Sequence, residues 1–167
     1  MSQCDPQERH FSGVQVRYQS TKSYEELVAA LLADVGKQPV PIDDVAKDCS
    51  SWESYRDEVE SHVGASGFML FATFDHGGWI TKAGIDRKVL RVIIGNPLIA
   101  ITMLRHDVTA GLFAPVELLL VGEESGGSSL IYVKPSSLMV VEPNPALLAA
   151  AEELDVKLAV LASKVAG

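Results

Sequence analysis

FMLFATFDHGGWITKAGIDRKVLRVIIGNP, residues 68–97, carries the strongest structural signal in the chain. Its first part, Phe68–Phe74, is almost continuously apolar, which is typical of a central strand that is covered on both faces. A second strand is predicted over Lys88–Ile94. Polar residues follow each strand, Asp75-His76 after the first and Gly95-Asn96-Pro97 after the second. The stretch therefore predicts two buried strands that deliver polar groups to loops, where sites tend to be built.

Outward from this stretch, the chain alternates between strand and helix patterns. Polar and apolar residues alternate over Val14–Gln19, which predicts a strand with one solvent-facing side. Ser23 with Glu26, and Ser50 with Glu53, are spaced as capping boxes and predict two helix starts. Further elements are expected as a helix turn at Asp43–Lys47, a helix from Pro97, strands at Val116–Val121 and Leu130–Lys134, and a final helix from about Pro145.

The order of these elements defines the expected fold class. Strand, helix, helix, strand, strand, helix, strand, strand, helix is a mixed arrangement, which favours an α+β fold. We expect a two-layer sandwich, with a mostly antiparallel sheet of about five strands and helices packed mainly on one face. Residues 1–12 are expected to form a flexible tail and residues 13–167 a single domain.

Composition limits the classes of function. The chain has 167 residues and a net charge of −8, and its Lys and Arg residues form no basic block. This argues against nucleic-acid binding, which needs a basic face. Every apolar run is shorter than the roughly 18 residues of a membrane span. The polar start MSQCDPQERHF has no hydrophobic signal core, so we expect a cytoplasmic protein without a membrane partner.

Asp75 and His76 are the first candidate site. The pKa of an ordinary His is close to neutrality, so His76 is the natural general acid or base, and Asp75 is placed to orient it. Neighbours on an extended strand point to opposite faces, but Gly77-Gly78 makes a turn available here. The structural alternative is that Asp75 caps the loop and His76 fills a polar gap.

The segment Gly95-Asn96-Pro97 is the second candidate site. Asn96 is a good N-cap and Pro97 suits the first helical position. A strand that runs into a helix start presents backbone N–H groups, which favour a carboxylate or phosphate. The structural alternative is an ordinary helix start. Trp79 and Tyr132 are aromatic residues near strand ends that are candidates for lining a pocket or for packing in the core.

Motifs for metals and nucleotides are missing from the sequence. It contains no HxH, HExxH or CxxC, and neither GxGxxG nor GxxxxGK[ST]. With two cysteines, a disulfide framework or zinc knuckle is not expected. We therefore expect neither a metal site nor a cofactor.

Short motifs in the second half follow one another in a recognisable order. They are FDH at 74–76, AG at 83–84, IGNP at 94–97, ITML at 101–104, AP at 114–115 and YVKP at 132–135. In this order and spacing they resemble the DUF302 family of uncharacterised small α+β domains. The resemblance implies a compact fold and a homodimer, but no established reaction. Some members carry Cys where this chain has Gly95, and residues 37–63 look like a helical insertion that is atypical of the family.

Three functions are left open by the sequence. The first is binding of a small organic or anionic ligand in a pocket near Asp75-His76 and the Gly95-Asn96-Pro97 helix start, with the helix at Trp52 as a wall or lid. The second is a cofactor-independent isomerase, dehydratase or lyase that uses His76. The third is a dimeric interaction module without a pocket. The candidate catalytic residues are His76 and Asp75, and the candidate ligand-binding residues are Trp79, Gly95, Asn96, Thr102 and Tyr132.

Overall fold

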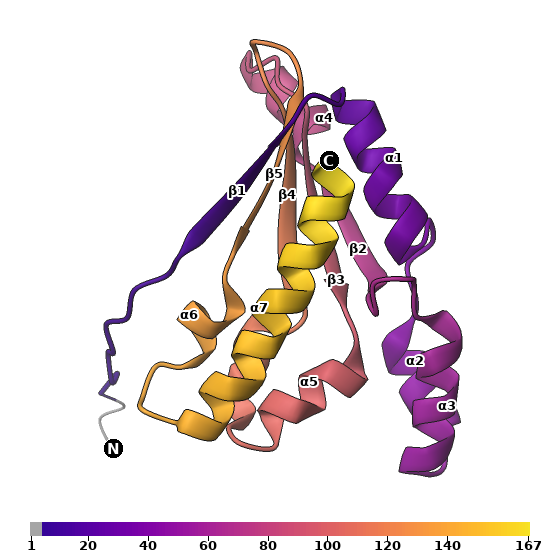
Figure 1. The fold of residues 1–167 in the computed structure, drawn as a ribbon, viewed down its shortest axis with the longest axis vertical. Coiled ribbons are helices and arrows are strands. Elements are labelled where there is room, and N and C mark those ends of the chain that lie inside the picture. The colour runs from indigo at the N-terminus through magenta and orange to yellow at the C-terminus, as the bar shows by residue number, and fades with distance from the viewer. Residues whose placement is uncertain (1–4) are drawn as a thin grey trace.

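The sheet is the organising element of the computed structural model, which describes residues 5–167. Its five strands run in the order β1-β5-β4-β3-β2, and all neighbouring strands are antiparallel (Figure 1). This arrangement confirms the predicted α+β class. The strands are β1 (Gln15–Ser20), β2 (Met69–Asp75), β3 (Val89–Gly95), β4 (Val116–Gly122) and β5 (Ser128–Val133).

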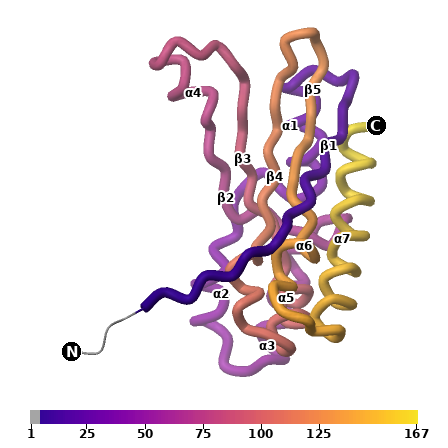
Figure 2. Tube along the Cα trace, turned by 90° about the vertical axis from the view of Figure 1, so that its left-hand side faces the viewer, coloured from indigo at the N-terminus to yellow at the C-terminus, as the bar shows by residue number. Residues whose placement is uncertain are grey.

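Helices cover one face of the sheet. The two long helices α1 and α7 lie along this face, and Figure 2 shows α7 to one side of the strands. Their apolar stripes pack on alternate residues of the strands, such as Leu118 and Leu120 of β4, in one buried cluster. The helices are α1 (Tyr24–Val35), α2 (Ile42–Asp48), α3 (Trp52–His62), α4 (His76–Ile80), α5 (Pro97–Leu104), α6 (Pro135–Met139) and α7 (Pro145–Ala166), with short 3-10 turns at Thr81–Ala83 and Val108–Phe113.

Capping explains where the first helices begin. Ser23 accepts a hydrogen bond from the backbone N–H of Glu26 at 3.2 Å, and the Glu26 carboxylate accepts one from the Ser23 N–H at 2.8 Å. This is the predicted capping box. The second prediction, Ser50 with Glu53, is wrong by one residue, because α3 is capped by Ser51, whose hydroxyl accepts from Ser54 N–H at 3.1 Å.

Strand β2 lies at the edge of the sheet, so its prediction as a central strand is wrong. Its apolar start is nevertheless covered, because the backbone N–H of Val40 donates to the carbonyl of Leu70 at 2.9 Å on the side away from β3. Farther along the strand, Phe74 is 51% exposed. The segment before α2 therefore covers only the beginning of this edge strand. That beginning is the part of β2 that is buried.

The second face of the sheet lies opposite α1 and α7. Strand register places one row of residues across it, namely Arg17, Ile131, Leu119, Arg91 and Phe74. The Arg91 guanidinium lies 5.7 Å from the centre of the Phe74 ring and also pairs with Glu117. This face is thus a mixture of apolar side chains and paired charges.

The start of the chain has no regular secondary structure over residues 5–14. Phe11 packs edge-to-face on Phe113, with ring centres 6.1 Å apart, and Arg9 pairs with Glu142 at 3.1 Å. Residues 1–4 of the predicted tail lie outside the described residues, and the flexibility of the tail stays a prediction. Within residues 5–167, no helix combines the length and the apolar character that crossing a membrane requires.

Candidate functional site

The β2–β3 hairpin separates the two candidate sites. Asp75 pairs with Leu90 at one end of the hairpin, whereas Gly95 pairs with Met69 at the other. About six residues of strand at roughly 3.3 Å each place these ends roughly 20 Å apart. The expectation of one pocket near both Asp75-His76 and the Gly95-Asn96-Pro97 segment is therefore wrong.

Asp75, His76 and Trp79 lie together at the α4 end of the hairpin. Asp75 is the N-cap of α4, and its carboxylate accepts a hydrogen bond from the Gly78 N–H at 3.0 Å. The Trp79 indole N–H donates to Nδ1 of His76 at 3.3 Å, and Trp79 is 58% exposed. The contacts of Asp75 match the structural alternative, a cap on the loop. The catalytic roles of His76 and Asp75 stay predictions.

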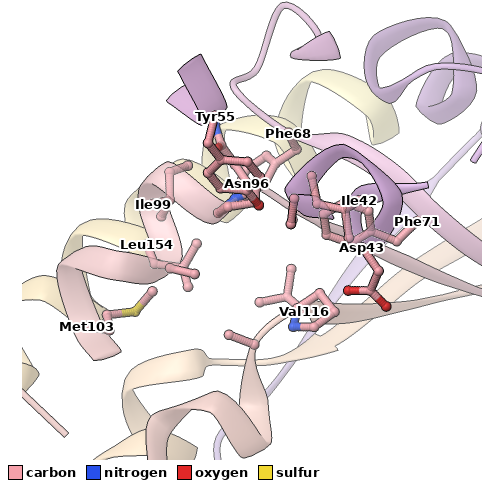
Figure 3. Close-up of a pocket in the computed structure, with 16 residues that line it drawn as sticks. Ile42, Asp43, Tyr55, Phe68, Phe71, Asn96, Ile99, Met103, Val116 and Leu154 are labelled. Atoms are coloured by element: carbon pink, nitrogen blue, oxygen red, sulfur yellow. The ribbon is translucent and has the colours of Figure 1, made fainter. Parts of the chain in front are cut away.

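A pocket lies at the other end of the hairpin, between α2 and α5 (Figure 3). Its volume is about 220 Å³. Ile99, Met103 and Leu154 stand on one side of it, and Ile42 and Phe71 on the other. The remaining lining residues are Asp43, Ala46, Tyr55, Phe68, Gly95, Asn96, Pro97, Ala100, Ala114, Pro115 and Val116.

Of the five predicted ligand-binding residues, Gly95 and Asn96 line this pocket. Trp79 is at the far end of the hairpin. Thr102 faces away, with its hydroxyl donating to the Ile99 carbonyl at 2.7 Å. Tyr132 is 5% exposed and stacks on Tyr18 in the core, where burial raises its pKa above the ordinary value. Of the five predicted residues, the structure therefore brings only Gly95 and Asn96 together in this pocket.

Gly95 makes close packing of the pocket wall possible. A Cβ atom at this position would lie 2.7 Å from Cε2 of Phe71 and 3.1 Å from Cβ of Pro115. Because such distances are shorter than van der Waals contact, any side chain here would displace the Phe71 ring. The absence of a side chain at Gly95 thus lets Phe71 and Pro115 pack closely against the backbone in the lining of the pocket.

Both polar atoms of the Asn96 side chain form hydrogen bonds that stabilise the fold. Its side-chain amide donates to the Gly67 carbonyl at 2.9 Å, and its side-chain oxygen accepts from the Leu98 N–H at 2.8 Å. Pro97 has no N–H, and the N–H of Ile99 bonds to the Asn96 carbonyl. The first three helical positions of α5 therefore offer no free donor in the part of the chain that the structure describes. Anion binding, which was predicted for this helix start, has no support here.

The segment 37–63 forms one wall of the pocket through α2 and α3. Ile42, Asp43 and Ala46 come from α2 and Tyr55 from α3, and Trp52 contacts the Tyr55 ring with centres 5.9 Å apart. The recurrence of aromatic residues at helical spacing was the available signal for Tyr55. The contributions of α2 and of Leu154 on α7 depend on packing between distant segments, and sequence reasoning missed them.

The pocket carries negative rather than positive charge. Asp43 is the one residue with a formal charge among those that line it. The pKa of Tyr55 is raised, first by burial and then by the nearby Asp43 and Cys49. Within residues 5–167, no group of three or more His, Cys, Asp or Glu side chains is arranged to hold a metal ion.

The fold and the pocket define a small α+β domain with an apolar cleft at one end of its sheet. The family model described as "Domain of unknown function DUF302" matches residues 45–165. The chain therefore belongs to the DUF302 family, as its motifs indicated. Since the match begins within residues 37–63, the prediction that this segment is atypical of the family stays a prediction.

A solved structure has the same fold. It is the crystal structure of an uncharacterized conserved DUF302 protein from Bacillus stearothermophilus, which is 18% identical. The match covers 90% of this chain and 97% of that one, with a TM-score of 0.65. At this identity the likeness shows the fold alone. No curated protein matches the chain.

Proposed function

We propose that this protein binds a small, largely apolar organic molecule in the pocket between α2 and α5. The observation that carries the proposal is the pocket itself, which holds about 220 Å³ between apolar side chains. Apolar cavities of about 150 Å³ bind molecules as small as benzene. Ligand sites typically combine such walls with a few polar groups, which Asp43 and Tyr55 supply here.

The same geometry favours binding over catalysis by His76. A general acid or base must reach its substrate directly or through one water molecule. His76 is separated from the pocket by the length of the β2–β3 hairpin, roughly 20 Å. A reaction in this pocket would therefore have to use other residues.

The experiment is a titration with 2-phenylethanol, monitored by amide NMR resonances. We expect saturable shifts at pocket residues such as Ala46, Ile99 and Ala100. Ala46 lines the pocket but is exposed to solvent, so the larger ring in Ala46→Phe can occupy pocket space without disturbing the core. Binding should therefore be lost. Ala149→Phe makes the same change on an exposed position of α7 outside the pocket and should keep binding. Absence of shifts in the unaltered protein, or equal binding by Ala46→Phe, would contradict the proposal.

A second candidate function is a homodimer formed through the second face of the sheet. The support is a hollow on this face, lined in part by Leu119, Ile131 and Leu112, with Leu112 81% exposed. A hollow with an exposed apolar side chain at its rim can receive the same face of a second copy, and larger apolar patches are typical of interaction surfaces. Sedimentation equilibrium should give twice the chain mass, and Leu112→Glu should give monomers. Val156→Glu, at a 63% exposed position of α7, should leave the dimer intact. A monomer at all concentrations would reject this candidate.

A further inference from the structure

The pocket is an apolar cleft whose lining carries a negative charge. No Lys, Arg or His lines it, and Asp43 is its one charged residue. The neighbouring Asp44 is paired with Lys47 at 3.0 Å, whereas the Asp43 carboxylate has no hydrogen-bond or ion-pair partner within residues 5–167. Figure 3 shows this carboxylate on the α2 side, across the pocket from Ile99, Met103 and Leu154.

The polar groups available to a ligand accept hydrogen bonds. An ionised carboxylate accepts only, and the Tyr55 hydroxyl can accept as well as donate. The amide of Asn96 is occupied by Gly67 and Leu98. A ligand that satisfies the Asp43 carboxylate must therefore donate hydrogen bonds at that end, and its other end must be apolar to match the walls.

The segment that carries Asp43 is acidic overall. The segment 37–63, which forms the wall at Asp43, has seven acidic and three basic residues. Charges of one sign around a cleft raise the local concentration of oppositely charged solutes. A carboxylate or phosphate ligand would instead be repelled by Asp43 and would find no free N–H at the start of α5.

We infer that the ligand of this pocket is a small amine whose ammonium group pairs with Asp43 and whose apolar body packs against Met103, Ile99 and Leu154. This inference rests on the proposed function, because it assigns the chemistry of the molecule that the pocket binds. Asp43 sets the preference for charge, and the apolar walls supply most of the affinity.

The experiment compares three probes of nearly equal shape at pH 7, namely 2-phenylethylammonium, 2-phenylethanol and phenylacetate. Since Asp43 is exposed, we expect the ammonium probe to bind roughly two- to fivefold more tightly than the alcohol, as for other surface ion pairs. Phenylacetate should bind more weakly than the alcohol. Added salt should reduce the spread between the charged probes, because it screens exposed charges.

Two variants test whether Asp43 causes the preference for the ammonium probe over the alcohol. Asp43→Asn should bind the ammonium probe and the alcohol equally, with the affinity for the alcohol unchanged. Asp48→Asn makes the same change in charge on the same helix, outside the pocket lining, and should keep the preference. If the alcohol binds but the ammonium probe has no advantage, or the advantage survives in Asp43→Asn, the inference is overturned and the proposed function stands. If the alcohol does not bind, the proposed function falls, and the inference with it.

Discussion

Lys164, in the last turn of α7, donates a hydrogen bond to the buried carboxylate of Asp34 near the end of α1, at 2.8 Å. The hydroxyl and backbone N–H of Ser66 bind the same carboxylate. The Asp34 side chain is 2% exposed. One carboxylate thus joins α1, α7 and the loop before β2.

This relationship predicts acid sensitivity. Burial alone would raise the pKa of Asp34, but Lys164 and Ser66 outweigh it and lower the pKa below the ordinary value. Because the folded-state pKa is lowered, the stabilisation is complete above the unfolded value of about 3.9 and is lost as the pH falls through the folded value. Asp34→Asn should cost roughly 2 kcal/mol at pH 7 and should reduce the loss of stability that occurs as the pH falls below about 4. Urea unfolding at pH 7 and at a series of pH values below about 4 measures both effects.

The contribution of Lys164 to stability is tested by Lys164→Met, and Lys157→Met is its matched control. Both lysines are exposed on α7, but only Lys164 contacts Asp34. Lys164→Met should cost roughly 1 kcal/mol, a small value because the ammonium group is largely exposed. Equal stability of the two variants would contradict the assigned role of this pair.

Gly64 is predicted to be essential for the same junction. A Cβ atom there would lie 1.9 Å from the Asp34 carbonyl oxygen. Because that oxygen belongs to the backbone, the clash cannot be relieved by a side-chain rotation. Gly64→Ala should cost roughly 1–3 kcal/mol in urea unfolding. Gly111→Ala, where the nearest atom is 3.7 Å away, should be tolerated, and a similar loss in both variants would refute the steric explanation.

Both the side-chain oxygen and the side-chain nitrogen of Asn96 are predicted to contribute to the stability of the fold. Asn96→Ala removes the cap on α5 and the bond to Gly67, so it should cost roughly 2 kcal/mol. Asn96→Asp keeps an acceptor for the Leu98 N–H and should recover only part of that loss. Asn144→Ala removes the cap from α7 and only a long, exposed hydrogen bond to the His106 carbonyl at 3.4 Å, so it should cost less than Asn96→Ala. The measurement is the free energy of unfolding, and full recovery in Asn96→Asp would mean that the Gly67 bond contributes nothing.

Gly95→Ala is predicted to weaken ligand binding. The added methyl group must push the Phe71 ring away from its place at the base of the pocket. We expect the affinity for 2-phenylethanol to fall severalfold while the far-UV circular dichroism spectrum stays unchanged. An unaltered affinity would show that the Phe71 position does not shape the site.

His76→Ala is predicted to leave the pocket intact. His76 contacts Trp79 at the opposite end of the hairpin, so neither the affinity for 2-phenylethanol nor the pocket resonances should change. A tenfold loss of affinity in this variant would contradict the placement of the site and revive a role for the Asp75-His76 segment.

Local elements of this protein can be predicted from its amino-acid sequence. Capping at Ser23 and Asn96 follows from short-range hydrogen bonds. The apolar residues of α7 from Leu147 to Val165 recur at helical spacing, and they are buried. Such features depend on residues within one or two turns, which is why they can be read from a single chain. The order of these elements indicated the α+β class, and the short motifs indicated the family.

Which residues share a site depends on tertiary packing. In an antiparallel hairpin the end of the first strand lies beside the start of the second, so Asp75 and Asn96 had to diverge once β2 paired with β3. The pocket joins α2, α5 and Leu154 of α7, segments that meet through the packing of helices on the sheet. Side-chain burial between distant segments sets that arrangement, and no local pattern encodes it.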